Sequence, residues 1–251
     1  MTFKERRRVR AITTARGLTA IAAGAGAAVF TLSSLAQTVV QSSGNDQNVI
    51  MINGRRVDPI VASGPEKTET RTLDTFRSIS ISLPAEATFT VADKPSVRIT
   101  TQANVLPVVV TRVENGVLSI GIDGAVTLRQ PIRIEIAGPS PEAVTLTGTG
   151  HFVATNVASS ALALKITGNA TMQVTGTVDH VSVSVSGTGM VDTSAIHARS
   201  LDADVTGTAS MHAFASESAK VHVSGIGKIQ IAGQPAQRQV DRTGLATVSF
   251  E

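Results

Sequence analysis

The sequence has no cysteine, no tryptophan and no tyrosine, and it has only seven phenylalanines among its 251 residues. The absence of cysteine excludes disulfides, thiolate metal sites and a cysteine-linked lipid anchor. The scarcity of large rings weakens any function that depends on stacking against sugars or bases. A core without such rings is built from Val, Ile, Leu, Ala and Met, which suits a narrow, layered interior.

Charged residues are also few, at 16% of the chain, although the pI is about 9.7. One N-terminal stretch accounts for the high pI, because it pairs a single acidic residue, Glu5, with six basic ones: Lys4, Arg6, Arg7, Arg8, Arg10 and Arg16. Subtracting this stretch from 22 basic and 19 acidic residues leaves 16 and 18, a net charge of −2. The rest of the chain therefore has no electrostatic reason to bind nucleic acid.

Residues 1–36 have the pattern of a signal peptide, with a basic start and an apolar run over residues 17–36. Ser34-Leu35-Ala36 places small residues where a signal peptidase cleaves, which predicts cleavage after Ala36. The alternative is an uncleaved anchor, because a run of about 20 residues is just long enough to span a bilayer. We expect a periplasmic, cell-surface or secreted protein, or one held at the inner membrane by residues 17–36 alone.

Residues 37–70 are rich in Gln, Ser, Asn, Gly and Pro, which predicts a linker. Over residues 71–142, apolar and polar residues alternate in short windows, such as 78–83, 87–91 and 132–136. A period of two with one apolar face predicts half-buried strands. Asn115-Gly116 predicts a hairpin turn, because both residues accept the positive φ angles of a tight turn.

Residues 143–251 repeat a Ser/Thr-Gly-x-Gly/Ala turn, which is degenerate in its last copy. The first glycines of the copies are spaced by 20, 19, 20, 18 and 19 residues: Gly148, Gly168, Gly187, Gly207, Gly225 and Gly244. Such constancy predicts an all-β fold, a β-solenoid or parallel β-helix-like stack with rungs of about 19 residues. The chain thus divides into residues 1–36, 37–70, an N-terminal β region at 71–142 and repeat rungs at 143–251.

Alignment on the first glycine predicts which side chains face inward. Residues two and four before it, and four and six after it, are nearly all apolar and alternate with polar ones. Each rung is therefore predicted to be two strands joined at the glycine turn, with a looser return loop such as residues 195–199. The glycine itself is expected where the turn needs a positive φ or has no room for a Cβ.

The last copy departs from this pattern, because Arg242 stands where the other copies have Val, Ile or Leu. An atypical terminal copy is typical of a cap. Arg242 also argues against continued end-to-end stacking of molecules.

The ordered set of turns, together with Gly233-Gln234-Pro235, Phe76-Arg77-Ser78-Ile79 and Val117-Leu118-Ser119-Ile120, resembles the head GIN domain family. That family is described as auto-transporter adhesins of bacterial envelopes. The resemblance covers residues 66–251 and implies a β-solenoid outside the cytoplasm. It carries no catalytic residues over to this chain.

Two pairs of polar residues stand at matching positions of adjacent copies: Asp192 with His212, and Asp204 with His222. Neighbouring strands would place the two residues of each pair about 4.8 Å apart, so either pair could supply metal ligands or a general base. Ordinary cross-strand pairing on a solvated face explains them more simply, since two ligands do not make a metal site. No cofactor is predicted.

The sequence therefore predicts an exported, non-catalytic adhesion, scaffold or ligand-interaction module with an unknown envelope or extracellular ligand. One alternative is a β-helix enzyme acting on polysaccharides, for which Asp202 and Asp204 could supply paired carboxylates. Another alternative is a self-assembling structural protein. The sequence does not specify an oligomeric state.

Overall fold

The computed structural model describes residues 39–42, 49–52, 55–57 and 59–251. The predicted signal peptide or anchor, residues 1–36, lies outside the described residues. Within the described part of the chain, no helix is long and apolar enough to cross a membrane.

Short strands occupy the first described segments: β1 (Val39–Ser42), β2 (Val49–Ile52), β3 (Arg55–Val57), β4 (Ile60–Val61) and β5 (Glu66–Thr72). The first three form an antiparallel sheet, and β4 pairs in parallel with β11. β5 pairs antiparallel with β8. Paired β structure thus begins inside the segment for which composition predicts a linker.

The following region contains strands and one turn of 3-10 helix: β6 (Ser78–Ile81), β7 (Ala85–Val91), β8 (Ser96–Gln102), η1 (Leu106–Val108), β9 (Val109–Glu114), β10 (Val117–Ile122), β11 (Val126–Thr127) and β12 (Ile132–Gly138). Alternate residues of β7 and β12 are buried, so the predicted strands with one apolar face are confirmed. The predicted hairpin is confirmed too. Asn115 and Gly116 have φ of 52° and 76° and join β9 to β10.

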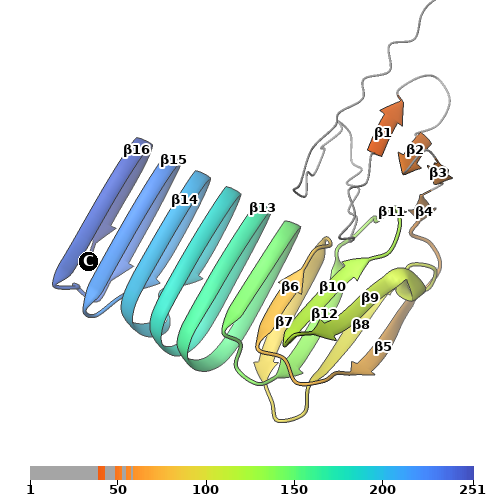
Figure 1. Cartoon of the computed structure of the whole chain (residues 1–251), viewed down its shortest axis with the longest axis horizontal. Helices are drawn as coiled ribbons and strands as arrows, with labels where there is room; N and C mark the ends of the chain where they lie inside the picture. Colours follow the sequence, from red (N-terminus) through yellow and green to blue (C-terminus); the bar gives the residue numbers. More distant parts are fainter. Residues whose placement is uncertain (1–38, 43–48, 53–54, 58) are drawn as a thin grey trace, which may run out of the picture.

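The repeated sequence forms four long strands: β13 (Ala143–Thr193), β14 (Ile196–Phe214), β15 (Ser218–Ala232) and β16 (Gln237–Phe250). Each pairs in parallel with the next, and glycine pairs with glycine along Gly187, Gly207, Gly225 and Gly244. Successive copies therefore lie side by side in a row from β13 to β16 (Figure 1). Paired residues of neighbouring strands are thus one sequence repeat apart in the chain.

The return segment between copies is more ordered than the sequence suggests. Residues 195–199 are predicted to be a loose loop, but Ile196 to Arg199 belong to β14, and Ile196, His197 and Ala198 pair in parallel with β13. Ile196 and Ala198 are buried. The prediction of a loose loop is wrong here, because these two apolar side chains extend the core and draw the backbone into the sheet.

The core lies between the folded-over strands and is built from aligned aliphatic side chains. Val185, Val205 and Val223 occupy one inward position in three successive copies, and all are buried. The equivalent residue of the last copy is Arg242, which pairs in register with Val223 and is exposed. Each inner copy is covered on both sides by like residues, whereas β16 has a neighbour on one side only among the strands that the structure describes.

All these strands except β1 to β4 and β11 join one large mixed sheet. Its main order is β16-β15-β14-β13-β7-β12-β8-β5, with β6, β9 and β10 attached beside it. β7 and β6 pair in parallel with the start of β13, so the N-terminal region covers that end of the repeats. The described chain is thus all-β, and the edges of the main path are β16 and β5.

Candidate functional site

The glycines of the repeated turn form a column along the sheet. All six have a positive φ, between 100° and 144°. A Cβ on Gly168 would lie 2.5 Å from the carbonyl oxygen of Gly148, and a Cβ on Gly207 would overlap the carbonyl of Gly187 in the same way. Atoms cannot approach so closely, so this column holds backbone against backbone. Its role is architectural, and functional side chains must be sought on the outward positions.

Asp192 and His212 are register partners on β13 and β14, as their positions in the repeat predict. The Asp192 carboxylate nevertheless makes its hydrogen bonds with Ser194. Its Oδ1 accepts hydrogen bonds from the backbone N–H of Ser194 at 3.1 Å and from the Ser194 hydroxyl at 2.6 Å. This carboxylate therefore shapes its own turn, which is a common use of Asp near a strand end.

Asp204, His222 and Asp241 follow one another at the same position of β14, β15 and β16. The sequence pairs Asp204 with His222, and the register places them on neighbouring strands. The contact of His222 is made on the other side, where its Nδ1 lies 3.2 Å from Oδ2 of Asp241. The His222 and Asp241 side chains are 45% and 70% exposed, so this is a solvated pair with little effect on stability.

A further polar group joins His180 and Ser200, which the sequence did not single out, to Asp202, which it offered only as the carboxylate partner of Asp204. His180 Nδ1 lies 2.8 Å from the Ser200 hydroxyl, and its Nε2 lies 3.6 Å from Asp202 Oδ2. Its signal in the sequence was a histidine aligned with Ser200 of the next copy, two residues before Asp202.

These residue types can form a nucleophilic triad, but the paired strands around Ser200 leave no backbone N–H groups free to stabilise an oxyanion. Oxyanion stabilisation requires backbone N–H groups free to face the reacting atoms. Here Ser200 and Asp202 lie on a strand paired on both sides, with β13 and with β15. The His180 and Asp202 side chains are about half exposed on this face. In the described part of the chain, no three His, Asp or Glu side chains are grouped to hold a metal ion.

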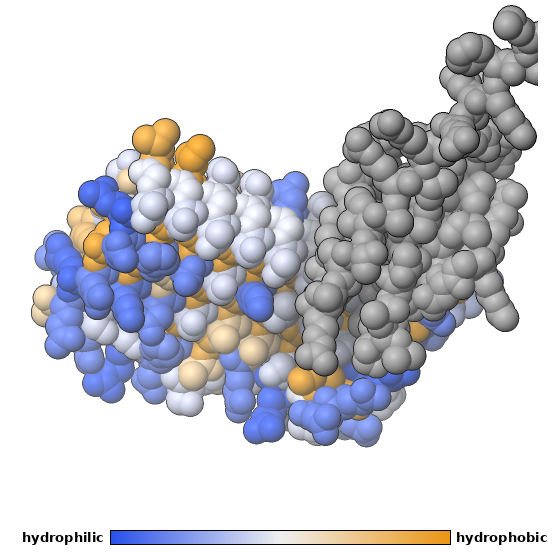
Figure 2. All heavy atoms as spheres, turned by 45° about the horizontal axis from the view of Figure 1, so that its top comes forward, coloured by the Kyte–Doolittle hydropathy of each residue, from blue (hydrophilic) through white to orange (hydrophobic). Residues whose placement is uncertain are grey.

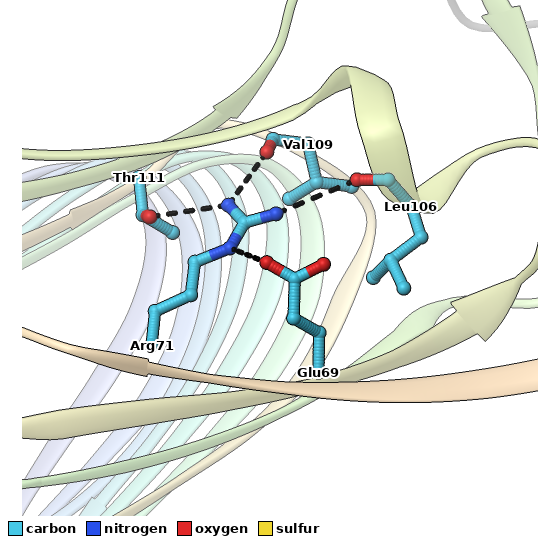
Figure 3. A network of polar contacts seen from close by, with 5 residues as sticks. All are labelled: Glu69, Arg71, Leu106, Val109 and Thr111. Atoms are coloured by element: carbon cyan, nitrogen blue, oxygen red, sulfur yellow. Dashed lines mark hydrogen bonds and ion pairs between the residues drawn. The ribbon is translucent and has the colours of Figure 1, made fainter.

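A polar network of four hydrogen bonds surrounds Arg71 of β5 (Figure 3). Its Nε donates to Glu69 Oε1 at 2.7 Å, and its Nη1 donates to the Val109 carbonyl at 2.7 Å and the Thr111 hydroxyl at 3.1 Å. Its Nη2 reaches the Leu106 carbonyl at 3.5 Å. With both terminal nitrogens and Nε engaged, the guanidinium ties β5 to η1 and β9 rather than presenting itself to a ligand.

Arg199 makes a second cross-copy contact, with its Nε 2.9 Å from Glu217 Oε1. The hydrogen bond and charge of Glu217, together with the charge of Asp179, raise the pKa of Arg199 above its usual value. The guanidinium stays charged at all physiological pH values, and this exposed pair marks the return side of the copies.

The outward face beside the turns is rich in hydroxyls. The residue after the first glycine is exposed in every copy: Thr149, Asn169, Thr188, Thr208, Ile226 and Leu245. Figure 2 shows a pale band of intermediate hydropathy across this part of the molecule, with hydrophobic residues in orange at its end. Ile226 is 56% exposed and Leu245 is 81% exposed, so the face changes from polar to apolar toward β16.

Residues 75–235 match the model of the family described as "Putative auto-transporter adhesin, head GIN domain", which is more than half of the chain. The chain belongs to the head GIN domain family. The match is narrower than the resemblance over 66–251 and ends before β16, so the last copy of this head GIN domain lies beyond it. No curated protein sequence matches the chain.

Solved structures share the fold of this head GIN domain. A putative adhesin from Bacteroides fragilis is 18% identical, with a TM-score of 0.64 over 76% of this chain and 100% of the other. A putative adhesin from Parabacteroides merdae is 20% identical, with a TM-score of 0.52 over 78% of this chain and 100% of the other. At such identities the likeness concerns the fold alone.

Proposed function

We propose that this head GIN domain is an exported β-solenoid that acts as a non-catalytic adhesion or ligand-binding module of the cell envelope. The solenoid interpretation is supported by the register, since glycine pairs with glycine and each valine of the inward row pairs with its equivalent in the next copy. In such a stack each rung covers its neighbour and none folds alone.

The observation that carries the binding function is the continuous outward surface. Equivalent exposed residues, such as Thr188 and Thr208, are register partners, so the outward side chains form a row along the sheet that is polar over the first copies and apolar at Ile226 and Leu245. A repeated, rigid surface suits an extended or repetitive envelope or extracellular ligand. The family description as adhesins points to the same class of function.

Binding is tested with the purified mature protein on isolated envelope fractions, measured as saturable retention. We expect retention by the wild-type chain and its loss when Thr188 and Thr208 are both changed to Glu. A matched variant, Glu114→Gln on the β9–β10 hairpin, should leave retention unchanged. Absence of saturable retention by the wild-type protein would overturn the proposal.

The polysaccharide-acting enzyme remains the rival from another class. Incubation with envelope polysaccharides, followed by analysis of reducing ends, separates the two functions. We expect no product. Product formation that is abolished by Asp204→Ala or Ser200→Ala would show that the protein is an enzyme and not a binding module.

Export is proposed from residues 1–36 and agrees with an adhesin role. Mass spectrometry of the protein recovered from cells should find Gln37 as the first residue if the signal peptide is cleaved. An intact N-terminus in the membrane fraction would favour the anchored alternative. Recovery of the intact chain in the cytosol would contradict export.

A further inference from the structure

The terminal strand β16 has an unusual edge. The order of the main sheet ends at β16, so one side of its backbone has no neighbouring strand in the described chain. Proteins commonly protect such edges with charged residues, because an open edge templates pairing with another strand. The opposite edge, β5, follows this rule, with Glu66, Lys67, Glu69 and Arg71 among its seven residues.

β16 follows the rule in its first half only. Arg238, Asp241 and Arg242 precede the turn at Gly244, whereas the six residues Leu245–Phe250 carry no charge and no proline. Ala246, Val248 and Phe250 pack partly against the core and remain partly exposed. A six-residue uncharged edge segment with alternating apolar side chains is competent for strand pairing.

The hydrogen-bonding phase of this segment follows from one contact. The backbone N–H of Glu251 donates to the Ile231 carbonyl at 2.9 Å, so Glu251 faces β15. Successive residues of a strand face opposite neighbours, and therefore Ala246, Val248 and Phe250 direct their N–H and C=O groups to the open edge. These three residues also carry the inward side chains.

We infer that Leu245–Phe250 pairs with the same segment of a second copy of this chain, antiparallel about a two-fold axis at Val248. In this register Val248 faces Val248, Ala246 faces Phe250, and Thr247 faces Ser249 of the second copy. The backbone N–H and C=O groups of Ala246, Val248 and Phe250 then bond to those of the second copy, giving about six backbone hydrogen bonds. The small Ala246 leaves room for Phe250, on which Arg238 already stacks at 4.7 Å.

Charge favours pairing through the second half of β16 over pairing through its first half. Two-fold pairing through the first half of β16 would bring Asp241 to Asp241 or Arg242 to Arg242, and like charges directly opposite are destabilising. The second half has none. β6 and β7 cover the other end of the repeats, and the far edge β5 carries four charged residues. The described main sheet therefore has no second uncharged edge, and the assembly closes at two chains.

Sedimentation equilibrium of the purified protein from micromolar to millimolar concentration tests this. We expect the mass to rise from that of one purified chain toward twice that value. Changing Thr247 and Ser249 both to Lys, or both to Glu, should weaken self-association about tenfold or more, because each places like charges opposite each other. Mixing the Lys and Glu variants should restore association.

The control is Ser210→Lys with His212→Lys, at the same two outward positions of the inner strand β14, which should associate like wild type. Circular dichroism confirms that every variant is folded. A wild-type chain that stays monomeric at millimolar concentration would overturn the inference. So would unchanged association of both charge variants, or a failure of the mixture to regain it.

Discussion

Replacing Gly207 by alanine tests the stacking of backbone on backbone. Gly207 has a φ of +120°, and an added Cβ would overlap the carbonyl oxygen of Gly187 in the preceding copy. Two penalties follow, one from the backbone conformation and one from the overlap. Gly124 separates them, because it has a φ of +97° but nothing within 4 Å of its added Cβ.

The conformational penalty of a non-glycine residue in such a region is about 1–3 kcal/mol and applies to both variants. Forcing a methyl group into a packed site costs about 1–3 kcal/mol more, and it applies to Gly207→Ala alone. The expected loss is therefore about 2–6 kcal/mol for Gly207→Ala. Domains are typically stable by about 5–15 kcal/mol, so this loss would be a large share of the free energy of unfolding.

Urea unfolding followed by far-UV circular dichroism measures both variants, since the chain has neither Trp nor Tyr for fluorescence. Gly187→Ala repeats the test one copy earlier and should behave like Gly207→Ala, because its Cβ would overlap the carbonyl of Gly168. Equal stability of Gly207→Ala and Gly124→Ala would refute the reasoning, since the close approach of the copies would then have no energetic consequence.

The remaining predictions concern packing and the Arg71 network. Met211→Ala should destabilise the protein by about 2–5 kcal/mol in the same assay, because Met211 is fully buried, whereas Met190→Ala, at a site 54% exposed, should change stability by about 0.5 kcal/mol or less. Similar losses for the two would contradict the assigned inward and outward positions. Arg71→Ala should cost about 1–3 kcal/mol, because the carbonyls of Leu106 and Val109 lose a charged donor. Arg112→Ala removes only an exposed ion pair with Glu114 and should cost about 0–1 kcal/mol. A larger loss of stability at Arg112 than at Arg71 would show that the Arg71 network does not hold β5 to η1 and β9.

The sequence predicted the features that depend on local pattern. The glycine spacing anticipated the pairing of Gly187 with Gly207, and Asn115-Gly116 anticipated the hairpin, because backbone conformation at these residues is limited by the residue itself. The alternation of apolar residues likewise anticipated the buried faces of β7 and β12.

Long-range pairing was beyond such reasoning. Nothing local indicates that β7 lies between β12 and β13, since that order depends on how distant segments pack. The Arg71 network joins residues 38 positions apart, from Arg71 to Val109, and its acceptors exist only once η1 and β9 are in place. The return segment at Ile196 and Ala198 was missed because two alternating residues are too short a pattern to distinguish a strand from a loop.

The candidate polar pairs show the same division. The repeat placed Asp204 beside His222 correctly in register, but the register alone does not decide that His222 contacts Asp241 instead. Side-chain choice between two equidistant neighbours depends on rotamers, which the sequence does not specify.

The central claim, that the copies stack one on another in register, is tested most directly with pairs of spin labels. The chain has no native cysteine, so a label at Thr149→Cys can be paired in turn with Thr208→Cys, Ile226→Cys or Leu245→Cys, all exposed at the same position of their copies. A stack predicts backbone separations of about 14, 19 and 24 Å, which grow by about 4.8 Å per copy. Separations that do not increase by this step from copy to copy would contradict the account.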